Sequence, residues 1–150
     1  MEIFQLTNEY KMKIKSFEDL QVWKDAREFV KAIYELISWT NFKKDYGFKD
    51  QIQRTAVSVM SNIAEGFERD NNKEFIKFLG YSKGSAGEIR SMLYVALDLN
   101  YITKSDFKRN YTNSISIIKQ ISNFKKYLRN YTIKEKITEA KIIIPQFLIP

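Results

Sequence analysis

The chain has 150 residues, no cysteine, no histidine and a formal net charge of +7. Its hydrophobic content of 44% supplies the core of one domain, and a chain of this length buries roughly 70% of its unfolded surface. The missing cysteines fit a reducing compartment and exclude disulfides and thiolate zinc sites. The missing histidines exclude serine–histidine and cysteine–histidine triads. We therefore expect no metal and no cofactor.

The two ends of the chain carry no recognisable export or membrane signal. The opening "MEIFQLTNEYKMKIK" mixes charged and apolar residues and lacks the uninterrupted apolar run of a secretory signal. The final apolar segment, "IIIPQFLIP", is too short to cross a bilayer and contains both prolines of the chain. These features predict a cytoplasmic protein that has no membrane partner.

Helical periodicity predicts a first helix from Glu18 to about Ser38. Ser16 is its candidate N-cap, and Asp19 stands at the position of a capping box. The apolar residues of this segment cover roughly 160° of the helix surface, which is wider than one core stripe requires. The excess suggests a second packing surface and hence contact with another subunit.

Residues 40–48 are expected to connect this helix to a second one, which runs from about Asp50 to Phe67. Polar residues recur along the side of the second helix that faces away from its apolar stripe. We expect them to form an ion-pair network, with Arg54 paired to Glu65, rather than an acid–base couple. The predicted members of this polar network are Arg54, Ser58, Asn62, Glu65 and, from the third helix, Glu88.

The stretch "GYSKGSAGEI", residues 80–89, raises the question of a phosphate-binding loop. Such a loop needs the order G-x-x-x-x-G-K-[ST] after a strand, whereas here Lys83 precedes the Gly-Ser pair and no strand lies upstream. The apolar period continues through the stretch, which predicts a third helix from about Asn72 to Leu99. Glycine inside a helix costs roughly 1 kcal/mol relative to alanine, so these glycines need another explanation.

Three of the glycines fall within about 60° of one another on the third helix, away from its core stripe. A surface without side chains permits close approach by another helix, and neighbouring apolar residues favour a contact between subunits. The alternative is a strip that simply faces water. The predicted subunit interface consists of Gly80, Tyr81, Gly84, Gly87, Met92 and Val95.

A fourth helix is predicted after the turn at residues 100–107 and extends to about Tyr131. Residues 104–150 contain 10 Lys/Arg and 3 Asp/Glu, so this part of the chain carries the whole net charge. A basic face is typical of a nucleic-acid partner, although a solvated helix explains the same bias. Tyr127 and Tyr131 are candidates for base stacking. The predicted nucleic-acid-binding residues are Lys104, Lys108, Lys119, Lys126 and Arg129.

Together these segments predict an all-α, up-down-up-down four-helix bundle over residues 16–131. Residues 1–15 and 132–150 are expected to be terminal extensions outside the bundle.

Several blocks of the sequence resemble one bacterial family, the proteins encoded by intervening sequences of 23S ribosomal RNA genes. The blocks are "FEDLQVWKDAREFVKAIYEL", "YGFKDQIQRTAVSVMSNIAEGFER", "NKEFIKFLGYSKGSAGEIRSML" and "ALDLNYI", and the resemblance covers residues 16–130. Two positions depart from the family pattern. Met60 replaces a usual proline and so removes an expected helix kink, and Gln53 replaces a second basic residue.

The resemblance implies a cytoplasmic four-helix bundle that often assembles into a ring-shaped pentamer and has no established enzymatic activity. It also implies a distant relationship to the accessory protein of diversity-generating retroelements, in which a basic pentamer is thought to hold RNA or cDNA against a reverse transcriptase. We therefore expect a non-enzymatic, homo-oligomeric adaptor that binds RNA or DNA. The alternative is a protein-interaction scaffold, such as an accessory subunit for a reverse transcriptase.

Overall fold

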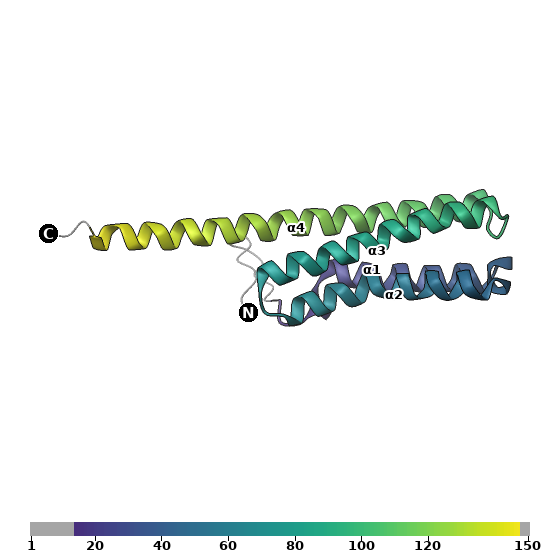
Figure 1. Ribbon diagram of the computed structural model, residues 1–150, viewed down its shortest axis with the longest axis horizontal. Helices are drawn as coiled ribbons and strands as arrows, with labels where there is room; N and C mark the ends of the chain where they lie inside the picture. Colours follow the sequence, from purple (N-terminus) through teal and green to yellow (C-terminus); the bar gives the residue numbers. More distant parts are fainter. Residues whose placement is uncertain (1–13, 148–150) are drawn as a thin grey trace.

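The computed structural model describes the backbone of residues 14–147 and the side chains of residues 14–134. These residues form four long helices and no strand, which confirms the all-α class (Figure 1). Two short 3-10 turns precede the first two helices. The elements are η1 Phe17–Asp19, α1 Gln21–Ser38, η2 Asn41–Lys44, α2 Tyr46–Glu68, α3 Asn72–Asp98 and α4 Lys104–Phe147.

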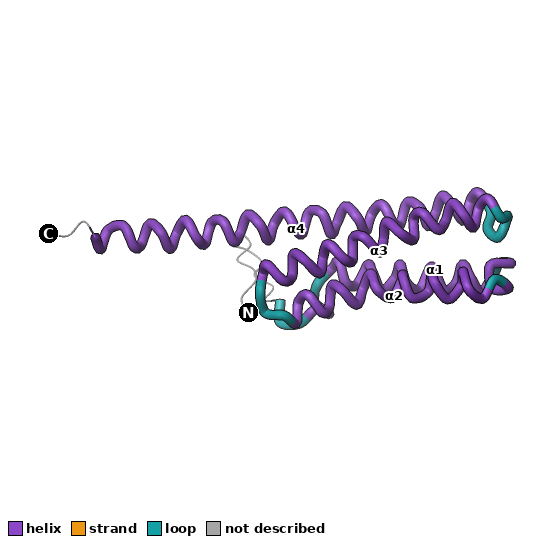
Figure 2. Tube along the Cα trace, viewed as in Figure 1, coloured by secondary structure: helices purple, strands orange, loops and turns teal. Residues whose placement is uncertain are grey.

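Successive helices run in opposite directions and are joined by short turns (Figures 1 and 2). Each helix packs against the next one along the chain, and α4 also packs against α1. This is the up-down-up-down order expected when short turns join long helices. The α3–α4 hairpin consequently forms one long side of the bundle.

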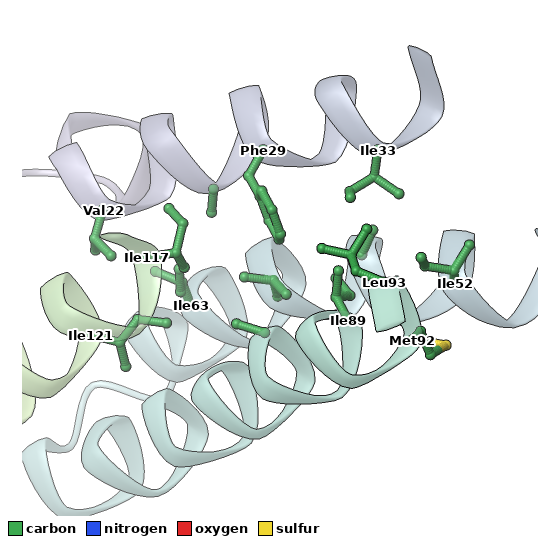
Figure 3. Close-up of a cluster of buried hydrophobic side chains, with 14 of the residues drawn as sticks. Val22, Phe29, Ile33, Ile52, Ile63, Ile89, Met92, Leu93, Ile117 and Ile121 are labelled. Atoms are coloured by element: carbon green, nitrogen blue, oxygen red, sulfur yellow. The ribbon is translucent and has the colours of Figure 1, made fainter. Parts of the chain in front are cut away.

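The core is one continuous apolar cluster with side chains from all four helices (Figure 3). Burial of each large aliphatic or aromatic side chain contributes about 1.5–3 kcal/mol, so this cluster is the main source of stability. Its largest fully buried members are Phe42, Phe75, Ile33, Ile37, Ile52, Ile63, Leu79, Ile89, Leu93, Ile121, Leu128 and Val59.

The wide apolar arc of α1 is mostly covered within the chain itself. Leu36 and Ile37 are buried, and Trp23 and Val30 pack partly buried against the core, whereas Tyr34 is 41% exposed. The width of the arc therefore does not require a second subunit, contrary to the interpretation drawn from the sequence. Both flanks of a helix are covered when it packs against two neighbours, as α1 does against α2 and α4.

α2 and α3 begin at polar caps, whereas α1 begins after Leu20, which forms no side-chain cap. The Asp19 carboxylate accepts from the backbone N–H of Ser16 at 3.1 Å, so the predicted capping motif forms, but it caps η1. α2 begins earlier than predicted because the Asp45 carboxylate accepts from the N–H of Phe48 at 3.1 Å. The Tyr101 hydroxyl donates to the same carboxylate at 3.0 Å and ties together the two turns at this end.

α4 continues to Phe147, well past its predicted end near Tyr131, and extends beyond the other three helices (Figure 1). The side-chain amide of Asn72, at the start of α3, donates to the Thr132 hydroxyl at 3.5 Å. Residues 132–147 thus continue α4 as a helix beyond the bundle (Figure 1). Of the predicted extensions at residues 1–15 and 132–150, residues 1–13 and 148–150 lie outside the described residues.

Candidate nucleic-acid interface

The predicted basic stripe lies on the surface of α4. All five of its residues are exposed, and they follow the helix from its first residue to the end of the bundle. The spacing of the four lysines places them within about 60° of one another, away from the apolar stripe of α4, and Arg129 lies at the edge of this group. None of the five forms an ion pair within the part of the chain that the structure describes. The stripe comprises Lys104, Lys108, Lys119, Lys126 and Arg129.

A second basic cluster forms where α3 and α4 meet, and two of its three members were absent from the predicted set. The Lys125 ammonium lies against α3. A Cβ added at Gly80 of this helix would be 3.2 Å from the Lys125 Nζ. Partial burial lowers the pKa of Lys125, and the positive charges of Arg129 and Lys83 lower it further. We refer to Lys83, Lys125 and Arg129 as the basic cluster. No carboxylate of the described residues pairs with any of the three.

An aromatic cluster occupies the same side of the hairpin, nearer to the α3–α4 turn. The ring of Tyr94 meets those of Phe107 and Tyr111 edge-on, with centroids 4.8 Å and 6.0 Å apart. Phe107 and Tyr111 stack on each other at 5.4 Å, and the Arg90 guanidinium lies 5.8 Å from the Tyr111 centroid. We refer to these four residues as the aromatic platform. Tyr94 remains 50% exposed.

The tyrosines proposed for base stacking belong to a different part of α4. Tyr127 is half-buried and packs against the hydrophobic core, and burial raises the pKa of its hydroxyl. Its ring stacks on Tyr131 with a centroid distance of 6.4 Å. Because the Tyr127 ring is already held by the core and by Tyr131, it is poorly placed to receive a base.

The glycine strip of α3 is only partly open. A Cβ added at Gly84 or Gly87 would meet no atom within 4 Å, whereas Gly80 is approached by Lys125. Tyr81 and Val95 are 50% and 44% exposed, as expected for residues away from the core.

The prediction that Met92 belongs to the subunit interface is wrong, because Met92 is only 6% exposed and belongs to the core (Figure 3). On the surface of α3, Met92 borders the stripe that faces α2, so packing within the chain covers this side chain.

The predicted polar network separates into independent pairs. Arg54 pairs with Asp50 of α2 at 2.5 Å, and Glu65 pairs with Arg69, the residue that follows α2, at 2.6 Å. The predicted Arg54–Glu65 pair therefore does not form. Charges spaced by one helical turn are the nearest available partners. Glu88 is exposed and has no ion-pair partner among the described residues.

The centre of the predicted network is a short chain of hydrogen bonds between α2 and α3. The Asn62 amide donates to the Ser58 hydroxyl at 2.9 Å, and that hydroxyl lies 3.0 Å from the Ser85 hydroxyl of α3. Ser85 was missed because its partner comes from another helix. Hydroxyl and amide groups so placed join the two helices but offer no acid, base or nucleophile activated by a neighbour.

Two further properties limit the kinds of site on this surface. Among the described residues, no three Asp or Glu side chains gather where they would hold a metal ion. No helix within the same residues combines the length and apolar character needed to span a bilayer.

These features define the class of the protein: an antiparallel four-helix bundle with a basic, aromatic surface along its α3–α4 hairpin. The chain belongs to the family of 23S rRNA-intervening sequence proteins, whose family model matches residues 18–144. The resemblance noted for residues 16–130 is thereby confirmed.

One solved structure supports the same assignment. A protein of unknown function from the S23 ribosomal protein family of Bacteroides thetaiotaomicron VPI-5482 is similar in fold, with a TM-score of 0.64 and 25% sequence identity. The match covers 70% of this chain and 98% of that chain. No curated protein matches this chain.

Proposed function

We propose that the protein is a non-enzymatic adaptor that binds nucleic acid through the α3–α4 side of the bundle. The observation that carries this proposal is the basic cluster, in which Lys125 lies against Gly80 of α3 with the charges of Lys83 and Arg129 nearby, and no carboxylate of the described residues pairs with any of the three. Like charges held together repel, and a phosphate chain is the ligand that relieves the repulsion. The exposed stripe of α4 extends this positive surface along the hairpin.

Binding of this kind depends on charge and shape rather than on base sequence. Each lysine or arginine that neutralises a phosphate releases a condensed counterion, so affinity falls steeply as salt increases. The sequence shows no base-reading motif, and the cationic side chains lie on the outside of a smooth helical hairpin. We therefore expect little discrimination between sequences and strong discrimination between polyanions and neutral ligands.

We propose that the adaptor acts as a homo-oligomer. Support comes from the open strip at Gly84 and Gly87, which has exposed Tyr81 and Val95 beside it. Repeating the basic surface around a ring would multiply the phosphate contacts and raise the avidity. The pentamer expected from the family resemblance is one such ring.

The proposal is tested by fluorescence anisotropy with a labelled RNA over a range of salt concentrations. We expect wild-type affinity to fall steeply with salt. The triple variant Lys83→Gln/Lys125→Gln/Arg129→Gln should bind more weakly and reduce the log–log slope by roughly two to three units. The matched control, Lys31→Gln/Lys43→Gln/Lys44→Gln, removes the same charge from exposed sites on α1 and η2. An equal loss of RNA affinity in the triple variant and in its control, or an affinity that does not depend on salt, would overturn the proposal.

A protein-interaction scaffold is the second candidate, and one observation favours it. Trp39 and Tyr46, at the turn between α1 and α2, are 86% and 76% exposed. Trp39 also lines a cleft with Leu97 and Lys104 of the opposite turn. Large apolar side chains exposed together are typical of surfaces that contact proteins. This candidate includes an accessory role beside a reverse transcriptase. It predicts that the affinity for RNA does not depend on the salt concentration.

A further inference from the structure

The exposed ring of Tyr94 is the least explained feature of the α3–α4 side. Half of the residue is accessible, although large aromatic side chains are normally buried when neighbours can cover them. Phe107 and Tyr111 contact it only edge-on, at interplanar angles of 61° and 82°. Neither ring therefore lies parallel to Tyr94, and among the described side chains no aromatic ring is stacked on it.

Cations lie on both helices beside this ring, while Asp98 follows Tyr94 by one turn of α3 and Asp106, which pairs with Arg109, directly precedes Phe107 on α4. Arg90 lies over Tyr111, one helical turn before Tyr94 on α3. Lys104 and Lys108 flank Phe107 along α4 and are exposed. Cations beside an accessible aromatic ring are the combination that binds the phosphates and the bases of one strand at the same time.

We infer that the aromatic platform stacks an unpaired base on Tyr94, so that the protein prefers single-stranded to double-stranded nucleic acid. This inference rests on the proposed function and specifies its ligand. Stacking needs a base that has left its helix, because bases inside a duplex already stack on their neighbours. The phosphates on either side of the stacked base contact Lys104 and Lys108, and the remaining strand continues along the hairpin to the basic cluster.

The order of these groups along the hairpin supports one continuous strand path. α3 and α4 are antiparallel, so Tyr94 and Phe107 lie near their connecting turn, and Gly80 and Lys125 lie further along the same side. The glycines between them carry no side chain that would project from this side of α3, and a Cβ added at Gly87 would meet no atom within 4 Å. The path between the platform and the cluster is therefore open at Gly87.

The inference is tested with a labelled oligouridylate of about 16 nucleotides, a duplex of the same length, and an abasic sugar–phosphate strand. Wild-type protein should bind the oligouridylate more tightly than either of the other two. Tyr94→Ala should weaken oligouridylate binding roughly five- to hundred-fold, the loss expected for one stacked base, and leave duplex and abasic binding unchanged. The salt slope should stay the same, because no charge is removed.

Two matched variants separate stacking from other effects. Tyr94→Phe keeps the ring and should retain wild-type affinity, whereas Tyr34→Ala removes a similarly exposed tyrosine from α1 and should change nothing. Salt-sensitive binding without preference for the oligouridylate, or equal weakening of all three ligands by Tyr94→Ala, would overturn the inference while the proposed function stands. Failure of every nucleic acid to bind would overturn both. The comparison of the oligouridylate with the abasic strand uses wild-type protein, so it tests the inference even if Tyr94→Ala is unstable.

Discussion

Gly66 of α2 faces two phenylalanines of α3 with no space for a side chain. A Cβ at this position would lie 2.7 Å from the Phe78 Cβ and 2.8 Å from Cδ2 of Phe75. Distances this short force the helices apart, and overpacking of a core typically costs about 1–3 kcal/mol. We therefore predict that Gly66→Ala lowers the free energy of unfolding by this amount, measured by urea denaturation.

The matched control is Gly84→Ala, because Gly84 also lies inside a helix but has open space around it. Alanine is the better helix former by roughly 1 kcal/mol, so this variant should be more stable than the wild type. A Gly66→Ala protein as stable as the control would contradict the close packing of α2 on α3.

Asp106 makes the start of α4 sensitive to acid. Its carboxylate accepts from the Thr103 hydroxyl at 2.8 Å, and the Asp106 N–H donates back to that hydroxyl at 3.1 Å. The Thr103 hydroxyl chiefly lowers the pKa of Asp106 below its usual 3.8, with help from the Thr103 N–H and the Arg109 guanidinium. A carboxyl whose pKa is lowered by folding stabilises the protein above its unfolded pKa.

We predict that Asp106→Asn reduces stability at neutral pH by about 0.5–2 kcal/mol, the usual worth of a helix cap. The difference from wild type should persist down to about pH 4 and disappear as the pH falls through the lowered pKa of Asp106. Thermal unfolding of both proteins from neutral to acidic pH measures this difference. A stability difference that stays constant with pH would show that the charge of this carboxyl does not contribute to stability.

Among the helices, α3 matched its predicted limits closely and α4 did not. The apolar stripe of α4 stops near Leu128 and Tyr131 because the bundle stops there, with Asn72 at the start of α3 opposite Thr132. Apolar periodicity records what a helix packs against, so it marks the end of the packing partner rather than the end of the helix. The early start of α2 at Tyr46 was missed because residues 40–48 were assigned to the connection, although Asp45 caps the helix from within that stretch.

The open strip on α3 makes a prediction about assembly. If another subunit packs over Gly84, a leucine there should separate the helices at a cost of about 1–3 kcal/mol for each interface. We predict that Gly84→Leu shifts the protein to smaller species in sedimentation velocity while far-ultraviolet circular dichroism stays helical. The Gly84→Ala variant is the size control. Unchanged sedimentation of Gly84→Leu would mean that the strip faces water.

For the whole molecule, the part of the site confined to one helix was predictable and the part shared between helices was not. The stripe from Lys104 to Arg129 follows from α4 alone. The basic cluster needs Lys83 to meet Lys125, and the platform needs Tyr94 to meet Phe107; these contacts exist only once α3 and α4 pair. Lys125 was left out because its position is close to the core stripe, where a single helix gives no reason to expect a second cation.

Trp39 gives the molecule an optical signal at one end. It is 86% exposed, whereas Trp23, the other of the two tryptophans, is partly buried and meets Phe17 edge-on at 5.0 Å. The two indoles should therefore differ in collisional quenching. Lys43 and Lys104 line the same cleft as Trp39, but so do Asp98 and Asp106, so these charges balance and give iodide no advantage over caesium.

We predict a downward-curving Stern–Volmer plot with iodide, and a straight, shallower one for Trp39→Phe. Any ligand or second copy that covers the two turns at this end will shield Trp39 and straighten the wild-type plot, so the emission reports which end of the bundle is occupied without an attached dye. A plot unaffected by Trp39→Phe would contradict the exposure of this indole.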